Sequence, residues 1–412
     1  MTNGHGVMIS LGTLQSSELQ KIRVASAYLF SLDHAKDDVF IESLDMPMVK
    51  KAFRAKAKRY HPDHCRDTAP DDIRKRNERF VKVEEAYRVL RSYLPESDST
   101  CGTEAERERR IIAVGGAKGG IGKSIFSANL AVFLAGQGKK VVAVDLDLGG
   151  ANLHLYLGET FLKGSINDYL QKRVPTLDDI AVPSRYGPLL LGGDSSQLGA
   201  SNIGFSQKLK LVKAIKQMDA DYTILDLGGD TSFNVIDFFL MADRRVVLTT
   251  CDPASYLEAY SFIKVALCRR LNRLFGIESE LRKRKDALLE TIIEEFIQSQ
   301  MGSKVRPICE LLSEVTEKLP GRVDVLRDAI GRFSPLLLVN RVGNRCNVRQ
   351  VVKRLQDVSR KVLSVNLSYL GALPQQAEIE MSARSLVPVM TSHPDSVFAR
   401  DMKVLAENLI MN

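Results

Sequence analysis

Residues 117–124 read AKGGIGKS, and this glycine-rich stretch decides how the rest of the chain is interpreted. An apolar run, 111–114, precedes it, and a segment with helical periodicity, 126–134, follows it. A strand, a glycine loop and a helix in this order can hold a polyphosphate, because the glycines let backbone amides point inward and the helix adds the positive end of its dipole. The sequence therefore predicts a nucleotide-binding loop made of Gly119, Gly120, Ile121, Gly122, Lys123 and Ser124.

The loop contains two lysines and a serine that can contact phosphate or a metal ion. Lys123 can reach the terminal phosphates of a nucleotide, and the Ser124 hydroxyl can ligate Mg²⁺. A common phosphate-binding loop has glycine at position 117, where this chain has alanine, and a second lysine, Lys118, comes next. The loop thus departs from the common pattern while it keeps the residues that bind phosphate and metal.

From residue 110 onward, short apolar runs alternate with longer segments of helical periodicity. Each run is bounded by Gly, Asp or Pro, as strands in βα units are. This alternation predicts an α/β fold with a doubly wound, mostly parallel sheet, in which ligands bind beyond the carboxyl ends of the strands. The predicted strands are 111–114, 141–145, 189–191, 223–226, 245–249, 336–339 and 367–370.

Three blocks are expected along the chain. Residues 1–95 form an all-α domain that is basic in its second half, residues 96–110 are polar and indicate a linker, and residues 111–412 form the α/β domain. Within that domain, residues 268–333 are charged, helical and too many for one crossover, which indicates a helical insertion. Two interpretations of this insertion are open: it is a solvent-exposed addition to the fold, or it binds a partner or forms a dimer interface.

Several motifs make the α/β domain resemble the ParA/MinD ATPases, which are P-loop NTPases of the SIMIBI type. The loop has their deviant K-G-G-x-G-K-[S/T] pattern, and DLDLGGAN at 145–152 is similar to D-x-D-x-G-x-x-N, most closely in the branch that positions flagella. The later motifs follow in the family's order: YTILDLGGD at 222–230, VLTTCDPAS at 247–255, LVNRV at 338–342 and LGALP at 370–374.

The resemblance implies that this domain hydrolyses ATP to ADP and phosphate. Its catalytic residues would be Lys118, Lys123 and Asp147, with Asp147 orienting or activating the attacking water. In this family the lysine at the position of Lys118 reaches across a dimer interface and neutralises charge on the partner's transferring phosphoryl group. ATP binding would therefore drive homodimer formation, and an activating protein would accelerate the slow hydrolysis that resets the switch.

The same resemblance implies ATP and Mg²⁺ as cofactors. The metal would be held by Ser124, Asp145 and Asp226, partly through water. The backbone at 228–229 would sense the γ-phosphate, although Asp230 stands where the family usually has glycine. The remaining nucleotide contacts would be Asn152 near the phosphates, Asn340 at the adenine, and Arg341.

The N-terminal block contains the tripeptide His61-Pro62-Asp63. A basic amphipathic segment, 49–60, runs into it, and the proline stops that helix. A second helix is expected over 71–94, with Phe80, Val83, Ala86, Tyr87 and Leu90 on one face. Two antiparallel helices joined at an HPD turn resemble a J-domain, which recruits an Hsp70 of the DnaK type and stimulates its ATPase. The residues implied in Hsp70 binding are His61, Pro62, Asp63, Lys50, Lys51, Arg54 and Lys58.

The favoured function is therefore an ATP-dependent dimerisation switch that positions a flagellum, a division site or DNA and recruits an Hsp70. A non-catalytic co-chaperone adaptor, with the ATPase domain as scaffold, is one alternative. An Fe–S carrier ATPase of the Mrp type is another, but such carriers need a CxxC pair and no two of the six cysteines form one. The cysteines are expected to be free thiols in a reducing cytosol.

Composition and charge indicate in which compartment the protein acts and which surfaces it can contact. The chain is 44% hydrophobic and 26% charged, without an apolar stretch of membrane-spanning length or a secretion signal, so a cytoplasmic protein is expected. The net charge of +8 permits contact with nucleic acid or anionic lipid. The amphipathic segment 397–412 predicts a helix that packs on the sheet, with peripheral inner-membrane contact as the alternative. The basic stretch favours non-specific DNA contact and a solvated helix equally, because Glu residues are interleaved in it; the basic residues are Arg269, Arg270, Arg273, Arg282, Lys283, Arg284 and Lys285.

Overall fold

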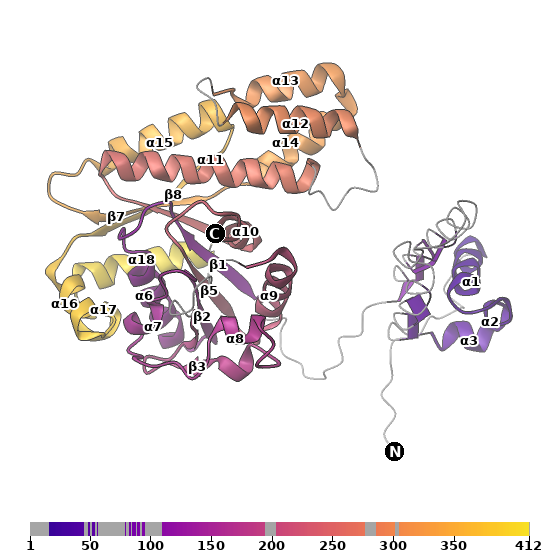
Figure 1. Cartoon of the computed structure of the whole chain (residues 1–412), viewed down its shortest axis with the longest axis horizontal. Helices are drawn as coiled ribbons and strands as arrows, with labels where there is room; N and C mark the ends of the chain where they lie inside the picture. The colour runs from indigo at the N-terminus through magenta and orange to yellow at the C-terminus, as the bar shows by residue number, and fades with distance from the viewer. Residues whose placement is uncertain are drawn as a thin grey trace. The chain divides into compact units, whose positions relative to one another are not determined.

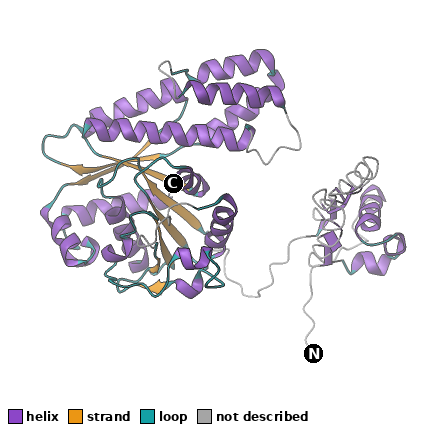
Figure 2. Cartoon of the chain, in the orientation of Figure 1, coloured by secondary structure: helices purple, strands orange, loops and turns teal. Residues whose placement is uncertain are grey.

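A computed structural model of the chain describes residues 16–44, 109–193, 203–276, 286–300 and 305–411. Between 48 and 94 it describes residues 48, 49, 52, 53, 56, 79, 82, 83, 85–87, 89, 90, 93 and 94. The chain divides into two compact units, Met1–Ala105 and Glu106–Asn412. Figure 1 shows the larger unit as a sheet between layers of helices, and Figure 2 shows the smaller one as helical.

An eight-stranded sheet in the order β3-β4-β2-β5-β1-β6-β7-β8 forms the centre of the larger unit. All neighbouring strands are parallel except β3, which runs antiparallel to β4. The predicted strands all form, and the two-residue edge strand β3 was not predicted because it is too short to carry an alternating pattern. The strands are β1 (Arg110–Gly115), β2 (Val141–Leu146), β3 (Val182–Pro183), β4 (Leu189–Leu191), β5 (Tyr222–Leu227), β6 (Arg244–Thr249), β7 (Leu336–Val342) and β8 (Ser368–Pro374).

Helices cover both faces of the sheet, so alternate strand residues enter two different cores (Figure 1). On β1, Ile111 and Ala113 join one core, and Ile112 and Val114 join the other. Burial on both sides is the reason that these strands read as continuous apolar runs. On one face lie α6 (Lys123–Gly136), α7 (Leu153–Tyr156), α16 (Ala377–Ser385), α17 (Val389–Ser392) and α18 (Val397–Met411); on the other lie α8 (Ile166–Leu170), α9 (Phe205–Gln217), α10 (Phe233–Met241), α11 (Pro253–Phe275) and α15 (Val348–Leu363).

Additional helices follow α11 along the chain. They are α12 (Ala287–Ser299), α13 (Ile308–Lys318) and α14 (Val323–Gly331), with a short 3-10 turn at Pro320–Arg322 between α13 and α14. A second 3-10 turn, Asp178–Ile180, precedes β3. Leu289, Ile293 and Phe296 of α12 and Leu311 of α13 are buried in the same core as α11. The apolar faces of these helices are therefore satisfied within the chain, and Figure 1 shows them stacked over α11 and α15.

The last helix, α18, packs against β8 and α6. Phe398, Met402, Leu405 and Leu409 on its apolar face are buried in the core on that side of the sheet. The face that a membrane would have to receive is therefore already covered by protein. No helix among the described residues is both long enough and apolar enough to cross a bilayer.

The smaller unit begins with α1 (Ser16–Leu29), α2 (Leu32–Lys36) and α3 (Asp38–Glu42). Its core joins α1 to the second predicted helix, because Val83 and Leu90 are buried with Ile22 and Leu29. Phe53 stacks on Tyr87 with ring centroids 4.3 Å apart, which brings the segment before the HPD tripeptide against the segment after it. The described residues thus show the helix pairing that the apolar spacing predicts.

Candidate nucleotide-binding site

The glycine loop lies between β1 and α6, at the carboxyl edge of the central strands. Gly120 and Gly122 have φ angles of +73° and +92°, a region that residues with a Cβ seldom adopt. A Cβ at Gly122 would also lie 2.4 Å from Asn340 Nδ2. Glycine is therefore required at 122 both by the backbone angle and by the approach of β7.

Lys123 begins α6 and is buried, with 6% of its surface exposed. Its Nζ donates to the carbonyl oxygen of Lys118, 3.0 Å away, so the side chain folds back over the loop. Burial lowers the pKa of Lys123, while the charges of Asp226, Asp147 and Asp230 raise it. A buried cation held over inward-facing backbone is suited to receive a phosphate.

Asp226, at the end of β5, is fully buried beside the same loop. Its Oδ1 accepts a hydrogen bond from Ser127 Oγ at 3.0 Å, and the Ser124 hydroxyl also bonds this carboxylate. Its Oδ2 is buried and has no hydrogen-bond partner. Such an orphaned carboxylate oxygen next to Ser124 fits a Mg²⁺ ion approached through water.

Asp145, at the end of β2, is buried next to Asp226 and is held by backbone amides. Its oxygens accept from the amides of Asp147 at 3.1 Å and Leu153 at 2.9 Å. Burial and the charge of Asp226 raise the pKa of Asp145, and burial raises that of Asp226. Because two buried carboxylates repel each other, a divalent cation would stabilise the pair.

The loop after β5 approaches the glycine loop at backbone distance. A Cβ at Gly229 would lie 3.0 Å from the amide nitrogen of Gly119, and one at Gly228 would lie 3.4 Å from Asp147 Oδ1. The predicted water-orienting carboxylate, Asp147, therefore lies beside the segment 228–229. Asn152 stands immediately before α7, and its side chain makes no capping hydrogen bond to that helix.

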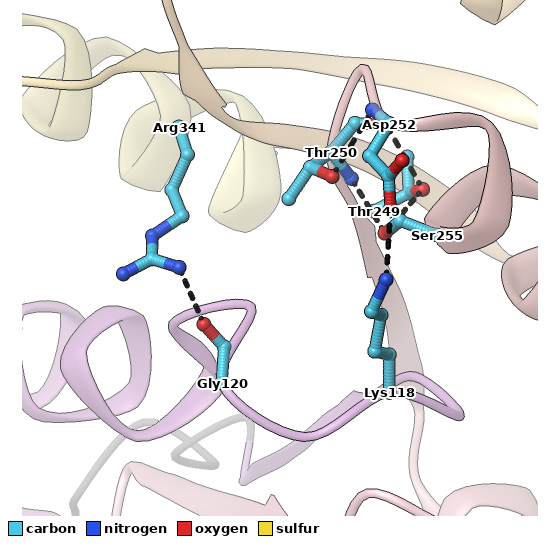
Figure 3. A network of polar contacts seen from close by, with 7 residues as sticks. All are labelled: Lys118, Gly120, Thr249, Thr250, Asp252, Ser255 and Arg341. Carbon is cyan, nitrogen blue, oxygen red and sulfur yellow. Dashed lines mark hydrogen bonds and ion pairs between the residues drawn. The ribbon is translucent and has the colours of Figure 1, made fainter.

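Lys118 is held by a carboxylate that sequence reasoning did not single out (Figure 3). Its Nζ bonds Asp252 Oδ2 at 2.8 Å, and both side chains are exposed. This hydrogen bond raises the pKa of Lys118 and lowers that of Asp252. The loop that carries Asp252 is itself braced, because Ser255 Oγ accepts from the amide of Thr250. An acidic residue directly before Pro253, after a strand, was the signal in the sequence for this partner.

Asn340 and Arg341 lie at a register shift between β7 and β8, in the part of β7 nearest the glycine loop. Asn340 Nδ2 donates to the carbonyl oxygen of Ile121 at 2.7 Å, and Arg341 donates to that of Gly120 at 2.8 Å (Figure 3). Arg341 has a φ of +55°, which is unfavourable for a side chain of its size. Strand irregularity and a strained residue commonly occur at functional sites.

Two cavities border this region. One, of about 490 Å³, is lined by the glycine loop, by residues 250–252, and by the loop after β7. The second, of about 210 Å³, extends from Gly122 and Asn340 toward α16. Both cavities include Arg341 and Gln375, and of the residues predicted to hold the nucleotide they are lined by Gly119, Gly120, Ile121, Gly122, Asn340 and Arg341.

The expectation that all cysteines are free thiols is wrong for one pair. Cys251 and Cys346, 95 residues apart, form a disulfide with a Cα–Cα distance of 5.9 Å. Spacing along the chain does not indicate this pairing; it arises because β6 and β7 are neighbours and their following loops meet. Cys268 is free and buried, and Cys309 is free and exposed.

Other predicted binding residues fall elsewhere. The proposed Hsp70-binding set, His61, Pro62, Asp63, Lys50, Lys51, Arg54 and Lys58, lies outside the described residues, as do 282–285 of the basic stretch. Arg269 is buried and bonds Asp237 through Nε at 2.9 Å. Arg270 donates to the carbonyl oxygen of Ala329 at 2.9 Å. Arg269 is thus engaged inside the protein and does not present its charge to DNA.

Comparisons with known proteins agree with this geometry. Residues 112–389 match the CobQ/CobB/MinD/ParA nucleotide-binding domain, and residues 42–94 match the DnaJ domain. The antiactivator FleN of Pseudomonas aeruginosa is 32% identical over 171 residues, which cover 41% of this chain and 58% of FleN. The flagellum site-determining protein YlxH of Helicobacter pylori is 30% identical over 167 residues, or 38% of this chain and 53% of YlxH.

The matched segments thus span little more than half the length of these two relatives. MinD of Synechocystis, named a septum site-determining protein, is 30% identical over 190 residues, which cover 46% of this chain and 71% of that protein. Among solved structures, the cell division ATPase MinD of Pyrococcus furiosus superposes with a TM-score of 0.48 at 19% identity, covering 73% of this chain and 98% of that one.

Proposed function

The chain belongs to the CobQ/CobB/MinD/ParA nucleotide-binding family, and on this premise we propose that its larger unit is an ATP-hydrolysing switch that dimerises when it binds ATP. The observation that carries the proposal is the orphaned Oδ2 of Asp226, buried beside Lys123 and Ser124. A buried carboxylate next to a phosphate-binding loop is costly unless a cation completes it. The arrangement therefore favours a nucleotide bound together with Mg²⁺.

The residues of the loop would act as follows. Lys123 and the amides of 119–122 hold the phosphates, and Asp147 orients the attacking water. Bound Mg²⁺, held by Ser124 and through water by Asp145 and Asp226, would neutralise charge on the β- and γ-phosphates. Lys118 would leave Asp252 and reach the phosphates of the partner subunit, so each site would be complete only in the dimer.

The relatives and the smaller unit support a proposal for the biological role. FleN is named an antiactivator, YlxH a flagellum site-determining protein and MinD a septum site-determining protein. We propose that this chain likewise positions a cellular structure, namely a flagellum, a division site or DNA. The J-domain would recruit an Hsp70 to that place, and an activating protein would trigger hydrolysis. We propose that this activity takes place in the cytoplasm, where ATP and an Hsp70 would both be available, with a membrane surface as one candidate platform.

The test compares two lysine variants for nucleotide binding, dimer formation and ATP hydrolysis. Lys123→Ala should lose binding of a fluorescent ATP analogue. Lys118→Ala should still bind the analogue but stay monomeric, with hydrolysis reduced about 100-fold, the usual cost of one transition-state charge contact. Light scattering after gel filtration measures the dimer, and phosphate release measures turnover.

Lys139→Ala, an exposed lysine outside the site, is the matched control and should behave as wild type. Asp147→Ala should bind ATP, dimerise and fail to hydrolyse it. If wild type with Mg²⁺ neither hydrolyses ATP nor dimerises, the switch is excluded and the co-chaperone adaptor becomes the better interpretation.

A further inference from the structure

The Cys251–Cys346 pair joins two loops that line one cavity together with the glycine loop. Cys251 lies between β6 and α11, directly before Asp252, whose carboxylate holds Lys118. Cys346 lies in the loop between β7 and α15, five positions after Arg341 of β7, whose guanidinium donates to the carbonyl oxygen of Gly120. A covalent link between the cysteines therefore fixes the loop of Asp252, the residue that bonds Lys118, to the loop that follows β7.

Both cysteines also line the cavity of about 490 Å³, together with Lys118, Arg341 and Arg345. Each is only partly buried, so a small reagent in the cavity can reach the sulfur atoms. Thiol–disulfide exchange proceeds through the thiolate, and neighbouring positive charge stabilises that anion. The arginines of this cavity provide such charge.

The other described cysteines lack this combination. Cys268 is buried in α11, and burial raises the pKa of its thiol to about 11, which leaves it protonated and unreactive. Cys309 is exposed near the start of α13 and does not line the cavity. Among the described residues, reactivity toward a small disulfide is thus concentrated at the nucleotide site.

We propose that Cys251 and Cys346 are a thiol-modification site that turns the switch off when oxidised, an inference that rests on the proposed function. The two thiols react with a small disulfide, RSSR, in two exchanges. A thiolate first displaces RS⁻ to form a mixed disulfide, and the second thiolate then displaces the remaining RS⁻. The products are the protein disulfide and two RSH, with the two protons of the cysteines carried by the released thiols.

The cross-link would act on function by restricting the movement of residues 250–252. With the link formed, residues 250–252 stay against the loop after β7, so Asp252 keeps Lys118 in its own subunit. Lys118 is then unavailable to the partner's phosphates. The reduced protein frees residues 250–252 to move with α11 when the dimer forms. Disulfides in a reducing compartment are mostly transient and regulatory, which agrees with a switch rather than a permanent brace.

The experiment treats the full chain with glutathione disulfide, removes the reagent, and measures three quantities with and without later reduction by a phosphine. Peptide mapping by mass spectrometry gives the fraction of Cys251–Cys346 cross-link. Light scattering gives ATP-dependent dimer formation, and phosphate release gives hydrolysis. Dimer formation and hydrolysis should both fall in proportion to the cross-linked fraction and should recover on reduction.

Cys251→Ser and Cys346→Ser should each stop at the mixed disulfide and form no cross-link, and the double variant should be insensitive to glutathione disulfide, whereas Cys309→Ser should respond as wild type. The inference is overturned if glutathione disulfide produces no Cys251–Cys346 cross-linked peptide. It is also overturned if the cross-linked protein dimerises and hydrolyses ATP as the reduced protein does. Failure of the proposed function looks different: the reduced protein would then neither dimerise nor hydrolyse ATP, whatever the state of the cysteines.

Discussion

At the scale of single residues, the site depends on how closely neighbouring segments approach the glycine loop. Asn340 reaches the carbonyl oxygen of Ile121 only because nothing projects from Gly122. Gly229 approaches the amide of Gly119 in the same manner. The glycines therefore provide room for backbone contacts between segments as well as unusual backbone angles.

Gly122→Ala tests this requirement. The new Cβ would overlap Asn340 Nδ2, and the backbone would keep a left-handed angle, so the loop must shift. We expect the affinity for ATP to fall about tenfold or more, equivalent to ~1.4 kcal/mol of binding free energy. Titration with a fluorescent ATP analogue measures the affinity.

Gly138→Ala is the matched control, because Gly138 also has a positive φ, +76°, but a Cβ there meets nothing within 4 Å. It should cost about 1–2 kcal/mol of unfolding free energy from backbone strain and leave ATP affinity unchanged. Equal losses of affinity in both variants would show that general destabilisation, and not the contact with Asn340, is responsible.

At the scale of elements, a buried ion cluster holds three helices together beneath the site. Asp237 of α10 accepts hydrogen bonds from Lys208 of α9 and from Arg269 of α11. All three side chains are less than 10% exposed. Since α10 follows the loop at 228–229 and α11 follows Asp252, the cluster connects the helices behind two functional loops.

Asp237→Asn should destabilise the larger unit by about 3–5 kcal/mol, because it leaves two buried cations without a counter-charge. Urea unfolding followed by circular dichroism measures this free energy. Asp324→Asn, which breaks an exposed pair with Arg327, is the control and should change it by no more than about 0.5 kcal/mol. A change of similar size in both variants would contradict a structural role for the cluster.

The pH dependence of stability gives the same residue a second test. Burial raises the pKa of Asp237, but hydrogen bonds from Arg269 and Lys208 outweigh this, so the pKa lies below its ordinary value of 3.8. A lowered folded-state pKa contributes stability above pH 3.8 that is lost as the pH falls through the folded-state value. The wild type should therefore lose unfolding free energy in this acid range more steeply than Asp237→Asn does.

At the scale of the whole molecule, the chain combines a nucleotide-binding unit with a segment that matches the DnaJ domain. In the smaller unit, Val83 and Leu90 pack against α1, and Lys56 Nζ donates to the carbonyl oxygen of Tyr28 at 2.8 Å. Tyr28 is in the last turn of α1, where the helix leaves carbonyl oxygens without a backbone partner, and Lys56 supplies a hydrogen bond to one of them. The described residues of this unit thus form a core of their own.

His61→Gln in the full chain should abolish stimulation of a DnaK-type Hsp70 ATPase and leave the chain's own ATP hydrolysis unchanged. The physical reason is that the tripeptide, not the nucleotide site, is expected to contact the Hsp70. His64→Gln, three residues further along, is the matched control and should retain stimulation. Equal stimulation by His61→Gln and wild type in a single-turnover Hsp70 assay would contradict a J-domain function.

Much of the architecture could be predicted from the sequence, because it depends on local spacing. Apolar runs between helical segments specified the parallel strands, and AKGGIGKS lies between a strand and a helix, as its surroundings in the sequence predict. Apolar residues spaced three and four apart likewise placed Val83 and Leu90 on a buried face. Such patterns are legible along the chain because strands and helices repeat with fixed periods.

Only the tertiary structure decided which distant residues meet at that loop. Lys118 and Asp252 are separated by 134 positions, and Cys251 and Cys346 by 95. The sheet order places β6 between β1 and β7, so the loops that follow these three strands meet at one edge. Sequence spacing does not encode strand order, and for this reason the motif AKGGIGKS predicts a nucleotide-binding loop but neither the Lys118–Asp252 contact nor the Cys251–Cys346 pair beside it.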